Sequence, residues 1–449
     1  MRKKNRSGQN LRIIGQAQKD YFWNSLAGLL NAAEAVLMSM IITRLTGLTD
    51  AGILTIAFAI GNLMMSVGKF GVRNFQVTDT EDRFSFAVYL KTRAVTVFSM
   101  IVFTVIYLIY AVVRLDYSQD KICIIFFICM IYAVEALEDV IWGYYQHRGR
   151  LDAGAEIFCY RWIGILSSFA VVLYISRNLA FTLTVCFLFS ILLFVIQVWR
   201  SYGHICAEQD RSIFLLLSEV SWESVGSLLK AVFPLFGISF FSFYENNASK
   251  YAIDACLTDT KQACYGFVAM PVFVIGLLNN FIYQPMLVVM ADEWRQMEYA
   301  RFKKRIGRQM FIIGGISIIC ILGAYLFGIP VLSLLYDTDL TAYKSELMIL
   351  LCSSAFLAAS GYLSVVLTIM RCQKSLLWPH CIVSIIAIIV LEHIVEKYQT
   401  MGAAYGYLGL MILLCIFYGI ILVFKMRAVD GDGNESGHPG RRYKKYDQQ

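Results

Sequence analysis

The sequence IYAVEALEDVIWGYYQHRGRLDA, residues 131–153, begins like a membrane-spanning helix and yet carries three acidic residues among apolar neighbours. Glu135, Glu138 and Asp139 lie three or four positions apart, so they share one face of a helix. A charge at the centre of a bilayer costs roughly 3 kcal/mol on an insertion scale. This face is therefore expected to look into protein or water, and the stretch predicts a membrane protein with a polar interior.

The composition agrees with a membrane protein. Hydrophobic residues make up 58% of the 449 residues and charged residues 16%, whereas a soluble protein carries about 25% charged residues. The twelve cysteines stand singly, without a metal-site spacing, and are interpreted as small buried hydrophobic residues; a disulfide between Cys256 and Cys264 is the alternative. No Ser/His/Asp arrangement, phosphate-binding loop or signal peptide is recognisable. No catalytic residue, cofactor or metal is therefore expected, and the chain is predicted not to be an enzyme.

Twelve stretches are apolar enough to cross a bilayer, which takes about 20 residues. They lie at residues 20–43, 48–70, 92–113, 121–145, 155–176, 179–200, 229–251, 264–290, 308–328, 345–370, 376–395 and 402–425. With the N-terminus inside, 31 of the 39 Lys and Arg residues fall in inner segments, as the positive-inside rule requires. We therefore predict an all-α integral membrane protein of about 12 transmembrane helices with both termini cytoplasmic. Its net charge of +7 suits loops that face anionic lipid, and no nucleic-acid partner is expected.

The two halves of the chain are weakly similar. The first span carries Asn24, Asn31 and Glu34 on one face, and the seventh carries Glu245 and Asn246. The two glutamates are 211 residues apart, and the phrases that follow them keep a similar offset. Parallel repeats of this kind are typical of transporters. Two pseudo-symmetric six-helix lobes around a central cavity are therefore predicted.

The predicted boundaries follow from these spans. They define a basic cytoplasmic N-terminal tail (1–19), an N-lobe of spans one to six (20–200), a cytoplasmic linker (201–228), a C-lobe of spans seven to twelve (229–425) and a disordered cytoplasmic tail (426–449). The amphipathic residues 212–229 around the linker are expected to lie flat on the inner membrane surface.

Several phrases resemble a known family. They are the pattern N-x(6)-N-x(2)-E in the first span, TRLTGLTDAGILTIAFAIGNLMMSVGKFGVRNFQVTD, EALEDVIWGYYQHRGRLDAGA and YAIDACLTDTKQACYGFVAMPVFVIGLLNNFIYQPML. Over roughly residues 15–425 the chain resembles the bacterial polysaccharide-biosynthesis proteins of the multidrug/oligosaccharidyl-lipid/polysaccharide (MOP) exporter superfamily. The resemblance implies a flippase that carries polyprenyl-pyrophosphate-linked oligosaccharides from the inner to the outer leaflet by alternating access, for the assembly of a surface polysaccharide such as a capsule.

The resemblance also implies where the protein acts and with what. The implied location is the bacterial cytoplasmic membrane. The implied partners are the lipid-linked glycan, membrane lipids, a coupling ion (H+ or Na+) and polysaccharide polymerase or glycosyltransferase machinery.

The candidate site residues are polar groups in or beside the spans. The candidates for the wall of a substrate or ion cavity are Asn24, Asn31, Glu34, Glu135, Glu138, Asp139, Glu245 and Asn246. The candidates for binding pyrophosphate, which favours Arg and Lys, are Arg161, Lys250, Lys69, Arg148 and Arg150. The embedded acids outnumber the embedded bases. The acids are therefore expected to be protonated through burial, to bind a coupling cation or to form structural ion pairs.

For these residues a structural role is the alternative. Arg161 is expected to pair with Asp139 or Glu138 across neighbouring helices, and Lys250 with Asp254 four residues later. The basic turn at 148–150 is expected to mark topology. A functional role is favoured for the two acids that recur in both halves.

Two other functions remain as alternatives. One is an ion-coupled multidrug or cation exporter of the same superfamily, which would also use a membrane carboxylate. The other is a membrane enzyme such as a glycan polymerase. The enzyme is disfavoured because the predicted outer links are too short to carry a catalytic loop.

Overall fold

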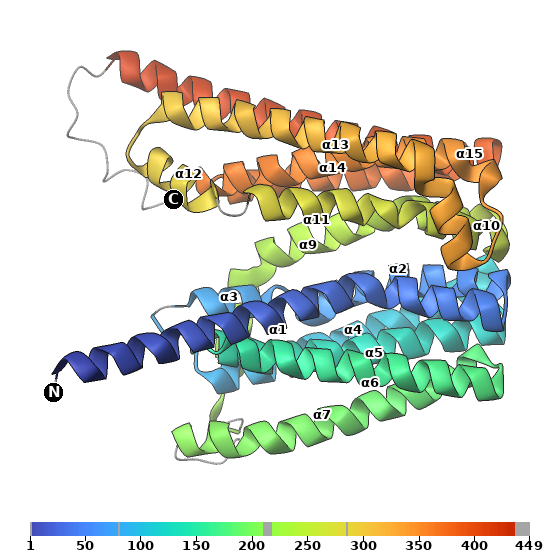
Figure 1. Cartoon of the computed structure of the whole chain (residues 1–449), viewed down its shortest axis with the longest axis horizontal. Helices are drawn as coiled ribbons and strands as arrows, with labels where there is room; N and C mark the ends of the chain where they lie inside the picture. The colour runs from blue at the N-terminus through green and yellow to red at the C-terminus, as the bar shows by residue number, and fades with distance from the viewer. Residues whose placement is uncertain (1, 80, 210–217, 284–285, 436–449) are drawn as a thin grey trace.

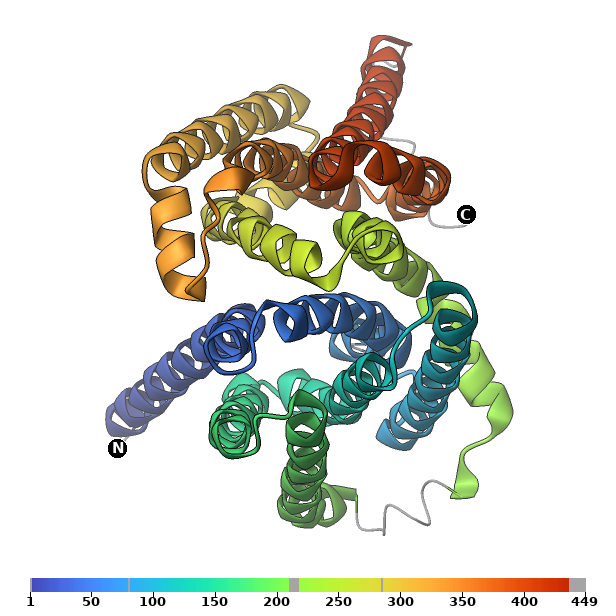
Figure 2. The same cartoon turned by 90° about the vertical axis from the view of Figure 1, so that its right-hand side faces the viewer.

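The computed structural model describes residues 2–79, 81–209, 218–283 and 286–435, and that part of the chain contains helices and no strand (Figure 1). The first lobe holds α1 (Arg2–Leu45), α2 (Leu48–Lys69), α3 (Val72–Thr78), α4 (Phe86–Leu115), α5 (Gln119–His147), α6 (Leu151–Ser176) and α7 (Leu179–Gln209). The second lobe holds α9 (Trp222–Cys256), α10 (Asp259–Ala269), α11 (Pro271–Tyr283), α12 (Leu287–Arg295), α13 (Tyr299–Tyr336), η2 (Thr341–Tyr343), α14 (Lys344–Ile369), η3 (Gln373–Leu376) and α15 (Leu377–Glu435). Figure 2 shows the two lobes side by side, blue to green and yellow to red.

Nine helical segments in the described residues are long and apolar enough to cross a membrane. Three further features bring this number to the predicted twelve. Helix α5 is long enough but carries three acids in its interior, the eighth span is divided between α10 and α11, and α15 contains two spans that meet at Gln399 (φ 54°, ψ −139°). The predicted all-α membrane fold with two lobes is confirmed.

Two helices extend beyond the predicted spans 20–43 and 229–251. Helix α1 is already helical at Arg2, before the first predicted span. Helix α9 begins at Trp222, where the Ser221 hydroxyl caps it by accepting from the Ser224 backbone N–H. Residues 210–217 of the predicted surface helix and residues 436–449 of the predicted tail lie outside the described residues.

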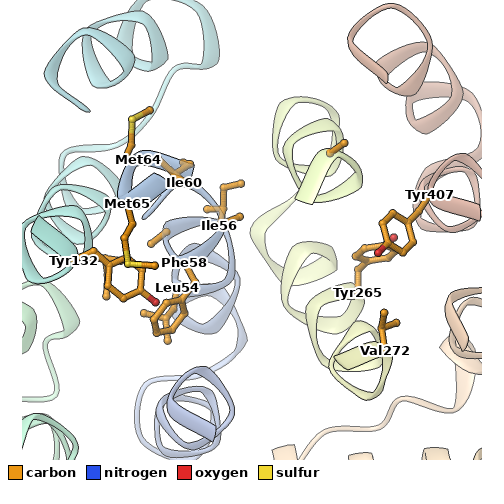
Figure 3. Packing of buried hydrophobic residues seen from close by; sticks show 14 of the residues in the cluster. Leu54, Ile56, Phe58, Ile60, Met64, Met65, Tyr132, Tyr265, Val272 and Tyr407 are labelled. Atoms are coloured by element: carbon orange, nitrogen blue, oxygen red, sulfur yellow. The ribbon is translucent and has the colours of Figure 1, made fainter. Parts of the chain in front are cut away.

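Apolar packing is continuous from one lobe to the other. Helix α2 is buried on nearly all sides, as expected for a helix that is apolar all round. Figure 3 shows Phe58 and Met65 of α2 beside Tyr132 of α5, and Tyr265 of α10 beside Tyr407 of α15. These side chains belong to one continuous cluster of buried hydrophobic residues that joins the lobes through α2, α9 and α10.

The lobes approach each other most closely at one end of the bundle. We call the end where α1 begins the proximal end and the opposite end the distal end (left and right in Figure 1). At the distal end, a Cβ added to Gly52 of α2 would lie 1.8 Å from the backbone oxygen of Asp259 in α10, and one added to Gly266 would lie 2.6 Å from Thr55 Cγ2. Only glycine allows backbones to come this close.

A buried lysine connects the two lobes at the distal end. Lys121 Nζ of α5 lies 2.7 Å from Asp254 of α9 and 2.7 Å from Asp259 of α10, and the Tyr117 hydroxyl also donates to Asp254. The predicted pair between Lys250 and Asp254 is wrong, because Asp254 turns toward the other lobe while Lys250 donates to Asn247 instead (3.1 Å).

At the proximal end of the described residues, α9 contacts the first lobe. Leu228 and Val232 pack into a small apolar cluster with Val72 and Val140 of the first lobe, and the Phe236 ring stacks on Phe70 with centroids 4.0 Å apart. The rest of α9 packs along α15. Both lobes therefore hold this helix.

Cysteines make no disulfide in the described part of the chain, where Cys256 and Cys264 are free thiols. The alternative of a bridge between these two is wrong.

Candidate functional site

The centre of the first lobe contains a buried cluster of charged side chains from α2, α3, α4, α5 and α6. We call it the N-lobe cluster. Its members are Lys69, Arg73, Arg93, Glu135, Glu138, Asp139 and Arg161. The three acids face protein rather than lipid, as their helical spacing predicts.

Arg161 and Lys69 bind the deeper acids. The Glu135 carboxylate lies 2.9 Å from Lys69 Nζ and 2.8 Å from Arg161 Nη2, and it accepts a third bond from Trp162 Nε1 (3.2 Å). Glu138 lies 2.6 Å from Arg161 Nε. Arg161 thus holds two carboxylates at once, which its guanidinium fork suits better than an ammonium does.

Asp139 is bound by two arginines from another direction. Arg93 Nη2 lies 2.8 Å and Arg73 Nη1 3.3 Å from its oxygens. Arg93 is fully buried and also donates to the Gly68 carbonyl (2.7 Å). The predicted pair of Arg161 with Asp139 is therefore wrong, whereas the pair with Glu138 is present. One step along α5 turns a side chain by about 100°, which takes Asp139 from α6 toward α4.

Arg73 and Arg93 are the members that sequence reasoning missed. Both were counted only as basic residues of an inner segment. With them, the cluster holds four cations and three acids, so the predicted excess of acids disappears. A usable signal was present, because Arg93 lies inside the predicted span 92–113 and an arginine there needs a buried partner.

A cavity of about 270 Å³ lies against the cluster, between α1, α2, α5, α6 and α7. Its polar wall brings together Asn24, Asn31, Lys69, Glu135, Glu138, Asp139, Trp142 and Gln197. Six of these residues are candidates from the sequence. Trp142 continues the helix face of the three acids of α5, because it follows Asp139 by three residues, whereas Gln197 is an addition that no local pattern marks.

Glu34 lies buried beside this region but does not line the cavity. Its Oε1 accepts a 2.7 Å hydrogen bond from the Tyr132 hydroxyl, and its Oε2 has no hydrogen-bond partner among the described residues. A buried carboxyl oxygen without a partner is costly when charged, so this site suits a carboxyl group that takes up a proton.

Glu245 forms a separate site in the second lobe. It is 1% exposed, its carboxylate accepts from Ser384 (3.1 Å) and contacts His380 Nδ1 (2.7 Å), and His380 Nε2 lies 2.7 Å from the Tyr418 hydroxyl. Its neighbour Asn246 contacts the Tyr407 hydroxyl at 3.4 Å. The structure does not bring this site and the N-lobe cavity into one lining.

The remaining candidates lie elsewhere. Lys250 lies near the distal end of α9. Arg148 and Arg150 are exposed in the turn after α5, where Arg148 lies over the Tyr144 ring (3.8 Å) and Arg150 pairs with Asp152 (3.0 Å). Among the described residues, no group of three His, Cys, Asp or Glu side chains is placed to hold a metal ion.

Comparisons with known proteins identify the fold. No protein-family model matches the sequence, and no curated protein matches it. The lipid II flippase MurJ in an inward closed conformation is similar in structure, with a TM-score of 0.66, 11% identity and coverage of 90% of this chain and 89% of that chain.

Multidrug transporters are similar as well. An inward-facing multidrug resistance MATE family transporter of the MOP superfamily gives a TM-score of 0.62 at 12% identity, covering 89% of this chain and 96% of that one. The Vibrio cholerae MATE transporter VcmN in its bent form gives 0.58 at 11% identity, covering 93% and 98%. The chain therefore has the two-lobed fold of these transporters.

Proposed function

We propose that this protein is a transporter of the MOP superfamily that flips polyprenyl-pyrophosphate-linked oligosaccharides across the membrane by alternating access. The observation that carries the proposal is the N-lobe cluster, in which four cations accompany three acids beside a polar cavity. The cluster has one cation more than it has acids, and Lys69 and Arg73 keep exposed fractions of 32% and 22%, which favours an anionic head group and disfavours a cationic drug. The fold is similar both to the lipid II flippase and to multidrug transporters, so the choice between the two functions rests on the charge of the cluster.

The physical task explains the need for such an interior. Sugar hydroxyls lose their hydrogen bonds to water in hydrocarbon, which costs several kcal/mol for each unpaired group. A polar cavity replaces those bonds, while the polyprenol tail stays in lipid. With the proximal end cytoplasmic, as the Lys and Arg bias predicts, the substrate enters from the inner leaflet of a bacterial cytoplasmic membrane. Glycosyltransferases that build the glycan would supply it there.

Lys69 is the cation best placed to meet a pyrophosphate. It lines the cavity and its side chain is 32% exposed, whereas those of Arg93 and Arg161 are 0% and 1% exposed. Charge-assisted hydrogen bonds to phosphate are the strong ones. Lys69 can therefore turn from Glu135 toward a ligand without dismantling the cluster.

The proposal predicts a large effect of Lys69→Gln. Flipping of a fluorescent polyprenyl-pyrophosphoryl glycan in proteoliposomes should fall about 10- to 100-fold, the loss of one charged hydrogen bond. Lys304→Gln, which neutralises an exposed lysine of α13, is the matched control and should flip normally. Undiminished flipping by folded Lys69→Gln protein would contradict the role of Lys69, and export of cationic dyes without glycan flipping would favour the exporter.

Glu245 and Glu34 are proposed to couple transport to protons, because each is a buried carboxyl in the first helix of its lobe. Glu245→Gln keeps the bonding pattern with Ser384 but cannot release a proton. A proton gradient should therefore stimulate flipping by the normal protein and not by the Glu34→Gln, Glu245→Gln double variant. Glu346→Gln, which alters another buried carboxyl bonded to a hydroxyl (Thr400, 2.9 Å), serves as control. Equal stimulation of all three proteins would remove the two acids from the mechanism.

A further inference from the structure

We infer that the cavity beside the N-lobe cluster is the subsite for one uncharged sugar ring of the transported glycan, recognised by Glu138 and Trp142. The inference rests on the proposed function and names the part of the substrate that this cavity takes.

Two residues that line the cavity each carry a buried polar atom without a hydrogen-bond partner among the described residues. Glu138 Oε1 is a buried acceptor and Trp142 Nε1 a buried donor, and neither has a hydrogen-bond partner among the described residues. Glu138 as a whole is only 5% exposed. Unpaired buried polar groups are costly. A sugar hydroxyl both donates and accepts, so the hydroxyls of a sugar ring can pair with an acceptor and a donor alike.

Each acid of the wall already has a cationic partner in the protein. Glu135 is paired with Lys69 and Arg161, Glu138 with Arg161, and Asp139 with Arg73 and Arg93. A cationic ligand would have to displace one of these paired cations, which is expensive, and among the cations of the cluster only Lys69, the most exposed one, is placed to exchange its partner for an anionic group at the edge of the cavity. The other polar groups of the wall are amides from Asn24, Asn31 and Gln197, which donate and accept like a hydroxyl. The wall therefore suits a neutral, hydrogen-bonding ligand.

The cavity has the size and the shape for a small ring. Its volume of about 270 Å³ is below the range of about 300–1,000 Å³ for sites of drug-sized ligands. Two glycines shape it. A Cβ on Gly154 would lie 2.0 Å from Trp142 Cδ1, whereas a Cβ on Gly28 would meet nothing within 4 Å. Gly154 lets the indole lie against α6, and Gly28 leaves the wall of α1 open.

Gly28 also provides the test. In purified full-length Gly28→Cys protein, the new thiol stands on the cavity wall without a steric clash, and its alkylation by N-ethylmaleimide can be followed by peptide mass spectrometry. The exposed native Cys123 serves as internal reference. The probes are glucose, galactose and N-acetylglucosamine, inorganic pyrophosphate, and the tetraphenylphosphonium cation.

At least one neutral sugar should slow alkylation of residue 28 and leave Cys123 unaffected. Adding Trp142→Phe, which removes the indole donor, should raise the sugar concentration for half-protection about fivefold, the effect of one neutral hydrogen bond. Trp199→Phe makes the same change at an exposed position of α7 and should not alter protection.

The other outcomes overturn the inference. Protection by tetraphenylphosphonium or by pyrophosphate alone would assign the cavity to an ion, and protection by no probe would leave it a water-filled recess. The glycan-flipping assay on the same preparation separates the two proposals. Flipping of the glycan without protection by sugars would contradict only the sugar subsite. Protection by sugars without flipping would contradict the flippase function and leave a sugar-binding site.

Discussion

Arg161→Met is expected to destabilise the protein by about 3–5 kcal/mol, the cost of removing one partner from a buried ion pair. Arg161 is 2% exposed and holds Glu135 and Glu138 together. Glu135 keeps its ion pair with Lys69 after the change. Glu138 loses its partner, because its ion pair among the described residues is the one with Arg161, and is left as a buried, unpaired charge. The loss should appear as a large drop in melting temperature in detergent, with little folded protein recovered.

A second substitution identifies the cause. Adding Glu138→Gln removes the uncompensated charge, so the Arg161→Met, Glu138→Gln protein should regain much of the lost stability, and the two changes should be strongly non-additive. Arg301→Met, which removes an exposed arginine paired with Glu298, should cost at most about 1 kcal/mol. If Arg161→Met melted like the parent, the cluster would not be holding the first lobe together.

Gly52→Ala is expected to prevent the lobes from closing at the distal end. The added methyl carbon would lie 1.8 Å from the backbone oxygen of Asp259, and backbone cannot move aside as a flexible side chain can. Overpacking of this kind costs about 1–3 kcal/mol or more, which lowers the closed population by about 10- to 100-fold. Spin labels at positions 120 and 260, both near the distal end, should report a longer distance, and flipping should fall in proportion.

Gly266→Ala is the matched comparison at the same contact. The three atoms nearest its methyl group would all belong to the side chain of Thr55, with Cγ2 at 2.6 Å, Oγ1 at 2.9 Å and Cβ at 3.4 Å. Truncation by Thr55→Ala should therefore rescue Gly266→Ala and should not rescue Gly52→Ala. A normal label distance in the Gly52→Ala protein would show that the two helices do not need this close approach.

The sequence predicted which segments span the membrane, but it did not predict which charged residues form ion pairs with one another. Glu135, Glu138 and Asp139 were recognisable as protein-facing because three charges on one helix face are intolerable in lipid. Which cation binds which acid depends on how four neighbouring helices are rotated and shifted, and a single sequence does not specify that. The same reason explains why Arg93 looked like a topology signal and why Asp254 looked like the partner of Lys250.

Interrupted helices were only partly predictable. The eighth span carries Pro271, and the chain indeed breaks there between α10 and α11; a proline removes a backbone hydrogen bond. The change of direction at Gln399 has no proline or glycine at that residue, and the sequence showed only a gap between two apolar runs. Tertiary packing, including the bond from Lys261 Nζ to Gln399 Oε1 (2.6 Å), supports that turn.

The double attachment of α9 limits how far the halves of this molecule can swing. One stretch of the helix, around Leu228 and Val232, is embedded in the first lobe, and the stretch around Glu245 is tied to α15 of the second. Pro234 stands between them and weakens the backbone ladder at that level. A tilt of one lobe against the other at the proximal end would bend α9 between these two attachments. Under the proposed alternating access, the bend that α9 tolerates at Pro234 therefore limits how far the lobes can move apart there.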